Sequence, residues 1–128
     1  MYLLSQFSVL IYNIVKATSQ NLHREVFGLN NKIKNENVDF LFDCILALET
    51  VEECYEFFED LCTFPEIRAM AQRAVVAKML TEKTVYSNIV AQTGASTATI
   101  SRVNRSLQFG NGAYDTVFAR INKKSDEE

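Results

Sequence analysis

The sequence predicts an all-α fold of about six short helices that includes a helix-turn-helix. Residues that break helices are scarce, since the 128 residues include four Gly and one Pro. From Val38 to Ile121, apolar residues recur at spacings of three and four, the period of a helix face. No period-two alternation of useful length occurs, so no strand is predicted. With 48% hydrophobic residues the chain has the composition of a folded protein, and its length suits one domain.

We expect residues 1–37 to be an N-terminal extension and linker. One interpretation of its start is an amphipathic helix, because apolar residues lie at helical spacing at Leu3, Phe7, Leu10, Ile11 and Ile14. The other is a variable extension outside the folded domain. The apolar stretch is shorter than the ~20 residues that span a bilayer, and it lacks the basic start of a signal peptide. Its polar face carries only Lys16, so we expect no membrane association.

The predicted domain covers residues 38–124 and is followed by a frayed acidic tail at 125–128. Its first helix is marked by the apolar positions Val38, Leu41, Phe42, Ile45 and Leu48. Thr50 and Glu53 have the spacing of a capping box and open a second helix. That helix has an apolar stripe at Val51, Cys54, Tyr55, Phe58, Leu61 and Cys62. Its carboxylates lie on the remaining faces and are expected to form a solvated acidic surface.

A third helix is predicted from Thr63 to about Leu80. Pro65 is tolerated in a first turn, and Glu66 suits the positive end of the helix dipole. The positions expected inside are Ile67, Met70, Ala71, Ala74, Val75 and Met79. A short loop, 81–84, follows, and Thr84 is expected to cap the next helix.

The stretch from Tyr86 to Arg105 has the pattern of two short helices joined by a tight turn. Gly94 suits the left-handed backbone at which the first helix stops, and Ser96 is the expected N-cap of the second. The second helix carries Ile100, Val103 and Leu107 on one stripe. This is the layout of a helix-turn-helix, whose second helix enters a DNA major groove.

The opposite face of that second helix supplies the candidate base contacts, which are Ala98, Ser101, Arg102 and Arg105. Arg can pair with guanine, Ser can donate or accept, and Ala can touch a thymine methyl. No acidic residue lies between Gln92 and Gly112, so no carboxylate repels a phosphate backbone. The alternative interpretation is an ordinary helical hairpin whose arginines are solvated.

The net charge of −3 conceals a strong asymmetry along the chain. Residues 1–64 hold four basic and ten acidic side chains, whereas residues 65–125 hold nine basic and three acidic ones. The basic half therefore contains the helix-turn-helix, as expected of a nucleic-acid binder. The candidate phosphate contacts are the hydroxyls of Thr84, Ser87, Thr97 and Thr99 and the cations of Arg73 and Lys78.

The remaining chemistry-bearing residues do not indicate an enzyme, a metal site or a cofactor. The three cysteines have no Cys-x-x-Cys spacing, and the one histidine, His23, is far upstream. We interpret the cysteines as reduced core thiols of a cytoplasmic protein. A last amphipathic helix is predicted after Gly110-Asn-Gly112, with its apolar face at Tyr114, Val117, Phe118 and Ile121.

Three segments resemble the YerC/YecD group of the Trp repressor superfamily: Cys54-Tyr-Glu-Phe-Phe-Glu-Asp-Leu-Cys62, Ala71-Gln-Arg73 and Gly94-Ala-Ser-Thr-Ala-Thr-Ile-Ser-Arg-Val-Asn-Arg105. Phe109-Gly-Asn111 is also similar to that group. The resemblance covers roughly Val38 to Lys123. It implies an all-helical bacterial DNA-binding protein that forms an intertwined homodimer, with two recognition helices in successive major grooves of double-stranded DNA.

The resemblance also implies a candidate effector pocket at Gln72, Arg102 and Val103. In Trp repressor two arginines sandwich the tryptophan. One corresponds to Arg102, while the other falls near Gln72, which is not an arginine, although Arg73 is adjacent. Val103 stands where the family has a small residue, and its branched side chain would intrude on an indole. We therefore expect that tryptophan is not the effector. Arg102 has a competing role in contacting DNA.

Two classes of function follow from the sequence. The first is a sequence-specific DNA-binding transcriptional regulator, expected to be a repressor, acting as a dimer. The second is a helical protein–protein interaction module without specific DNA binding, which would use the acidic second helix and the N-terminal extension as contact surfaces.

Overall fold

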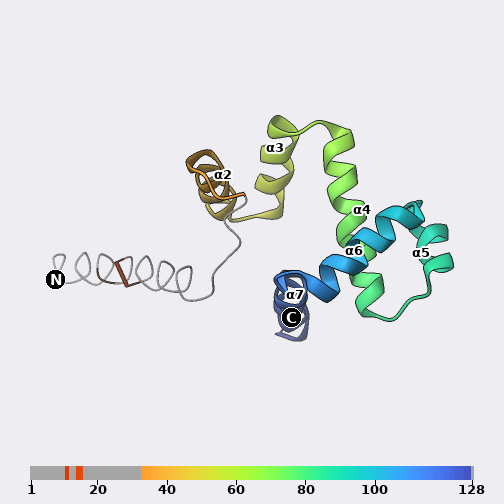
Figure 1. The fold of residues 1–128 in the computed structure, drawn as a ribbon. Helices are drawn as coiled ribbons and strands as arrows, with labels where there is room; N and C mark the ends of the chain where they lie inside the picture. The colour runs from red at the N-terminus through yellow and green to blue at the C-terminus, as the bar shows by residue number, and fades with distance from the viewer. Residues whose placement is uncertain (1–10, 12–13, 16–32, 128) are drawn as a thin grey trace. The chain divides into compact units, whose positions relative to one another are not determined.

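The structure, a computed structural model, describes residues 11, 14–15 and 33–127. These residues contain six complete helices and no strand, which confirms the all-α prediction (Figure 1). The helices are α2 (Glu36–Leu46), α3 (Val51–Leu61), α4 (Phe64–Thr81), α5 (Tyr86–Thr93), α6 (Thr97–Phe109) and α7 (Ala113–Glu127). Ile11, Ile14 and Val15 are helical, and the other expectations for residues 1–32 lie outside the described residues.

The chain divides into two compact units, residues 1–50 and residues 51–128. In the first unit, α2 begins because the Asn35 side chain accepts a hydrogen bond of 3.0 Å from the Val38 N–H. The helix ends at Leu46, where the Ala47 N–H donates to Asp43 and Cys44 carbonyls. Leu48 was expected on the apolar stripe of this helix, but it lies beyond the helix end.

In the second unit, α3 carries an apolar stripe that the chain leaves largely uncovered. Val51 is 65% exposed and Tyr55 is 75% exposed, while Phe58 is half-buried against the ring of Phe57. Cys54 is exposed, and Cys44 and Cys62 are half-buried, so the prediction of core thiols is wrong for the single chain. The carboxylates of α3 are exposed, as expected.

The start of α4 is a complete capping box. The Glu66 N–H donates to the Thr63 hydroxyl, and the Thr63 N–H donates to the Glu66 carboxylate at 2.8 Å. Pro65 occupies the first turn, where its missing N–H costs no intrahelical hydrogen bond. The helix therefore begins where the sequence predicts.

The end of α4 differs from the prediction at Thr84. The Thr84 N–H donates to the Met79 carbonyl at 3.0 Å, and the Lys83 N–H donates to the Leu80 carbonyl at 3.1 Å. Together these bonds form a Schellman motif, with Lys83 left-handed at φ +62°. Thr84 thus closes α4 and does not cap α5, whose N-cap residue, Val85, makes no side-chain capping bond.

The hairpin of α5 and α6 follows the sequence prediction closely. Gly94 ends α5 at φ +67°, and its N–H donates to the Val90 carbonyl. The Ser96 hydroxyl accepts from the Thr99 N–H at 3.1 Å and caps α6. Gly110 ends α6, where a Cβ would collide with the Ser106 carbonyl.

The core lies where α4, α5 and α6 pack against one another (Figure 1). Its buried residues are Val76, Ala77, Met79, Ile89, Ala95, Ile100 and Val103. Of the α4 positions predicted to be inside, Met79 is buried and Ile67 is half-buried. Met70, Ala71, Ala74 and Val75 are exposed, because α5 and α6 cover the adjacent face of α4, which bears Val76 and Ala77.

The last helix, α7, packs on this core through Tyr114 and Phe118, whose ring centroids are 5.8 Å apart. Val117 and Ile121, on the same predicted apolar face, remain about half exposed. The helix continues to Glu127, three residues into the tail that was expected to be frayed. No helix in the described part of the chain is long and apolar enough to cross a membrane.

Candidate nucleic-acid interface

Helix α6 separates its buried and exposed faces as the sequence predicts. Ile100 is fully buried and Val103 is 3% exposed, so this stripe anchors the helix to the core. All four predicted base contacts are exposed, at Ala98, Ser101, Arg102 and Arg105. Neither arginine makes an ion pair with another described residue. The face thus presents two uncompensated cations together with a small and a hydroxyl side chain.

The start of α6 adds polar groups to this face. Thr97 is exposed, whereas Thr99 is half-buried and its hydroxyl lies 3.0 Å from the hydroxyl of Ser96. Amide N–H groups in the first turn of a helix lack intrahelical partners and attract anions. Thr97 is therefore better placed than Thr99 to offer a hydroxyl to a phosphate.

The first turn of α5 also offers N–H groups, because no side chain caps it. Ser87 is exposed in its first turn, and Val85 supplies no side-chain cap for the first N–H groups. The Asn88 N–H donates to the Val85 carbonyl, and the N–H groups of Tyr86 and Ser87 before it are available to an anion. Thr84 precedes them and is half-buried, with its N–H already donating to Met79.

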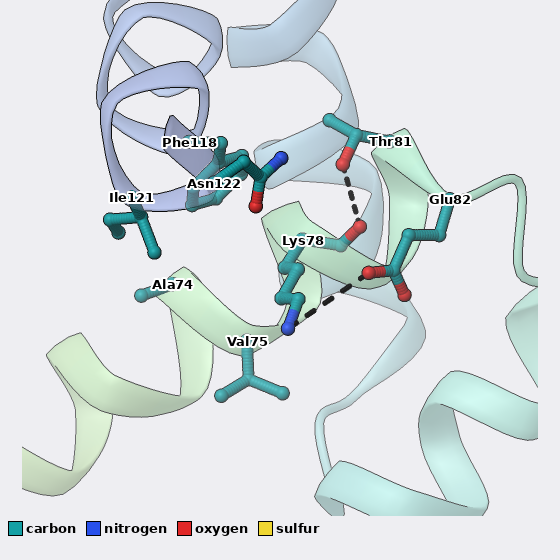
Figure 2. Close-up of a pocket in the computed structure, with 8 residues that line it drawn as sticks. All are labelled: Ala74, Val75, Lys78, Thr81, Glu82, Phe118, Ile121 and Asn122. Carbon is teal, nitrogen blue, oxygen red and sulfur yellow. Dashed lines mark hydrogen bonds and ion pairs between the residues drawn. The ribbon is translucent and has the colours of Figure 1, made fainter. Parts of the chain in front are cut away.

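The two cations of α4 that are candidate phosphate contacts have different surroundings. Arg73 is exposed and makes no ion pair with a described residue. Lys78 lies 4.0 Å from the Glu82 carboxylate, at the rim of a cleft of about 480 Å³ between α4 and α7 (Figure 2). Ala74, Val75, Phe118 and Ile121 form the apolar lining of this cleft. Lys78 therefore lines the cleft, and the nearby Glu82 carboxylate partly offsets its positive charge.

None of the three residues predicted for the effector pocket lines the cleft between α4 and α7. Gln72 is half-buried, and its Nε2 donates to the Thr93 carbonyl at 3.0 Å. Val103 is packed in the core, and Arg102 is exposed. Gln72 and Val103 are thus engaged in contacts within the chain.

Three features of this region were not predicted from the sequence. They are the Gln72–Thr93 hydrogen bond, the left-handed Lys83 and the cleft between α4 and α7. The sequence predicts that the residues lining the cleft lie on apolar helix faces. It does not predict that a cleft remains open between those faces. Gln72 carries no local sequence signal for its role, because that role depends on packing between helices. Lys83 lacks the glycine that usually marks a left-handed helix end, although the hydrogen bonds that hold it there are local.

Other chemistry is sparse in the described residues. No cluster of three or more His, Cys, Asp or Glu side chains with metal-binding geometry occurs among them. Among the described residues, the carboxylate of Glu66 has a displaced pKa, and this residue lies far from the hairpin in sequence. Its pKa lies below the usual 4.5 because the carboxylate accepts hydrogen bonds from the Thr63 N–H and hydroxyl.

The fold and the exposed basic face of α6 define a helix-turn-helix protein. A family model described as Trp repressor protein matches residues 36–122, so the chain belongs to the Trp repressor family. The family has a regulatory DNA-binding fold.

Relatives agree with this assignment. YerC of Bacillus subtilis (strain 168), described only as uncharacterized, is 50% identical over 97 residues, which are 76% of this chain and 93% of YerC. A crystal structure of a candidate Trp repressor from Staphylococcus aureus matches with a TM-score of 0.70 and 53% identity, covering 72% of this chain and 92% of that one. A TrpR-like protein from Eubacterium eligens ATCC 27750 matches with a TM-score of 0.70 and 56% identity over 73% and 96% of the two chains.

Proposed function

We propose that this protein is a cytoplasmic, sequence-specific transcriptional regulator, a repressor, that binds double-stranded DNA as a homodimer. The observation that carries the proposal is the outward face of α6, where Arg102 and Arg105 are exposed and free of carboxylate partners among the described residues. An Arg side chain can donate two hydrogen bonds to guanine in the major groove. The buried stripe of Ile100 and Val103 holds this face outward.

Phosphate contacts would fix the register of α6 on the duplex. The best candidates are the first turn of α5, which has no side-chain cap, and the exposed hydroxyls of Ser87 and Thr97. Thr99 and Thr84 are weaker candidates because both are half-buried. On α4, Arg73 is a stronger candidate than Lys78, whose charge is paired with Glu82.

The dimer in this proposal is supported by apolar surface that one chain leaves exposed. Val51 and Tyr55 on α3, Val75 on α4 and Ile121 on α7 are each about half exposed or more. Large exposed apolar patches are unfavourable in water unless a partner covers them. A twofold dimer would present two α6 helices to major grooves about 34 Å apart.

We also propose that tryptophan is not the effector of this protein. Gln72 cannot sandwich an indole as an arginine does, and its side chain is held by Thr93. Val103 is 3% exposed within the core and offers no space for a ring. A second function, that of a protein interaction module without DNA, rests on the exposed acidic and apolar faces of α3.

Selection of bound sequences from random duplex DNA, with and without added amino acids, tests the proposal. A dimeric regulator should select a palindrome, and added tryptophan should leave the selection unchanged. If the protein binds no duplex in a salt-dependent manner, the regulator proposal is wrong and the interaction module gains support.

Substitution of the α6 arginines provides the matching residue-level prediction. Arg102→Ala and Arg105→Ala should each cost about 1–3 kcal/mol of binding free energy and relax one base position, because a base contact is lost. Arg73→Ala should weaken binding to all sequences and reduce the salt slope by about 1. Arg68→Ala, an exposed arginine near the start of α4, is the charge-matched control. Competition binding on the selected site and its single-base variants measures these effects.

A further inference from the structure

The turn between α5 and α6 is tied to α4 by a hydrogen bond from outside the hairpin. The Gln72 Nε2 donates to the Thr93 carbonyl at 3.0 Å, across 21 residues of chain. Within the hairpin, the side chains of Thr93, Ser96 and Ser106 form hydrogen bonds to positions at most four residues away. The bond from Gln72 differs from these because it links two helices.

The carbonyl that Gln72 contacts lies at the end of α5. The last carbonyls of a helix have no intrahelical N–H partner, so an outside donor is favourable there. The hydroxyl of the same residue, Thr93, donates to the Ile89 carbonyl at 2.7 Å and accepts from the Ala95 N–H at 3.1 Å. Thr93 thus joins α4, α5 and the residue that precedes the N-cap of α6.

Apolar packing alone would leave the orientation of the hairpin poorly defined. Contacts among Val76, Ile89 and Ile100 hold the helices together, but the hydrophobic effect has no preferred direction. A hydrogen bond depends strongly on distance and angle. Gln72 lies one turn before Val76 on α4, so it extends the packed stripe with a directional group at the hairpin turn.

We propose that Gln72 is a positioning residue for the DNA-reading helix α6, acting through Thr93 and Ala95. Ala95 is 2% exposed, so the chain enters α6 from a point that the core and these hydrogen bonds define together. The consequence for DNA rests on the proposed function: the clamp favours the orientation in which α6 fits a specific site. Non-specific attraction to phosphates requires no such orientation.

Gln72→Met tests the proposal, because it keeps the length of the side chain and removes its N–H donor. Gln72→Glu is the second variant, since an ionised carboxylate accepts only and would face the Thr93 carbonyl. Gln108→Met, on an exposed position of α6, is the matched control. Each full-length variant is measured for affinity to the selected palindrome and to an unrelated duplex, and for amide hydrogen exchange without DNA.

Gln72→Met should reduce the ratio of specific to non-specific affinity roughly three- to tenfold, the effect of one hydrogen bond, while non-specific affinity stays unchanged. Exchange at the Gly94 and Ala95 amides should rise by a similar factor, with the Val103 amide unaffected. Gln72→Glu should show the larger effect.

Two results would overturn the inference. One is an unchanged affinity ratio with unchanged exchange at Gly94 and Ala95. The other is a uniform rise in exchange that includes Val103, which would mean that Gln72 only stabilises the core. If the unsubstituted protein binds no duplex, the proposed function fails, and the exchange data still decide whether Gln72 holds the turn.

Discussion

At the scale of single residues, two left-handed positions differ in chemistry: Lys83 precedes the hairpin of α5 and α6, and Gly94 lies at its turn. Gly94 has φ +67° and Lys83 has φ +62°. A glycine has no Cβ and adopts this conformation without strain, whereas an L-residue pays roughly 1–2 kcal/mol. Lys83 is held there by the Schellman bonds that end α4. These hydrogen bonds therefore maintain the left-handed conformation of Lys83 against its own backbone preference.

Lys83→Gly should therefore stabilise the protein. Relief of the left-handed strain exceeds the extra entropy that glycine brings to the unfolded chain, which leaves a gain of about 0.5–1 kcal/mol. Equilibrium denaturation measures the free energy of unfolding. Lys83→Ala is the control, because it also removes the charge but keeps the Cβ, and it should bring no gain. Equal effects of the two substitutions would show that the charge matters and the backbone conformation does not.

At the scale of elements, α4 organises the second unit. Its start is the Thr63–Glu66 capping box and its end is the Schellman motif at Lys83. Between them, one face packs on α5 and α6 through Val76, and a neighbouring face lines the cleft beside α7 through Val75. A shift of this helix would move the hairpin and the cleft together.

The capping box makes the start of α4 sensitive to pH. Hydrogen bonds from Thr63 lower the pKa of Glu66 below 4.5 in the folded protein. The folded state thus favours the ionised carboxylate, so this stabilisation is present above about pH 4.5 and is lost as the pH falls through the lowered pKa.

Glu66→Gln should consequently reduce the free energy of unfolding at pH 7 and have a smaller effect at the acid end of the range. Thermal unfolding of both proteins between pH 3 and pH 7 measures the difference. Glu52→Gln, an exposed carboxylate in the first turn of α3, is the matched comparison. A difference between Glu66→Gln and the unsubstituted protein that is constant with pH would contradict the ionised capping bond.

At the scale of the whole molecule, the single chain has a small core and much exposed apolar surface. In the part of the chain that the structure describes, the largest fully buried side chains are Ile89, Ile100 and Val76. Phe40, Tyr55, Phe64 and Phe109 are each at least 64% exposed. Such a balance is typical of a subunit whose partner completes the core.

Two neighbouring valines of α4 test this interpretation. Val76 is fully buried and Val75 is 49% exposed. Val76→Ala should lower the free energy of unfolding by about 1–3 kcal/mol through lost burial and a residual cavity. Val75→Ala should weaken the dimer, so its unfolding midpoint should fall most at low protein concentration.

Thermal unfolding over a hundredfold range of concentration, with sedimentation analysis, measures both effects. Val85→Ala, exposed in the α4–α5 connection, is the control and should change little. A midpoint independent of concentration for the unsubstituted protein would contradict the dimer.

The local features of the fold could be predicted because short-range chemistry determines them. Gly94 suits a left-handed stop and Ser96 suits an N-cap, and both occupy those positions. The stripe of Ile100 and Val103 was recognised from spacing alone and is buried. The prediction for Thr84 is wrong. Threonine before a helix is a common N-cap, but the N–H of Thr84 donates to the Met79 carbonyl in the Schellman motif that ends α4.

By itself, the sequence determined the helices, the hairpin and the polar face of α6, since these follow from periodicity, capping groups and the placement of charge within a few residues. Only the tertiary structure decided which face of α4 is buried, where Lys78 lies, and that Gln72 contacts Thr93. Those outcomes depend on how α4 packs against α5, α6 and α7. Helix periodicity identifies an apolar face, but the partner that covers it is chosen by contacts between residues distant in the chain.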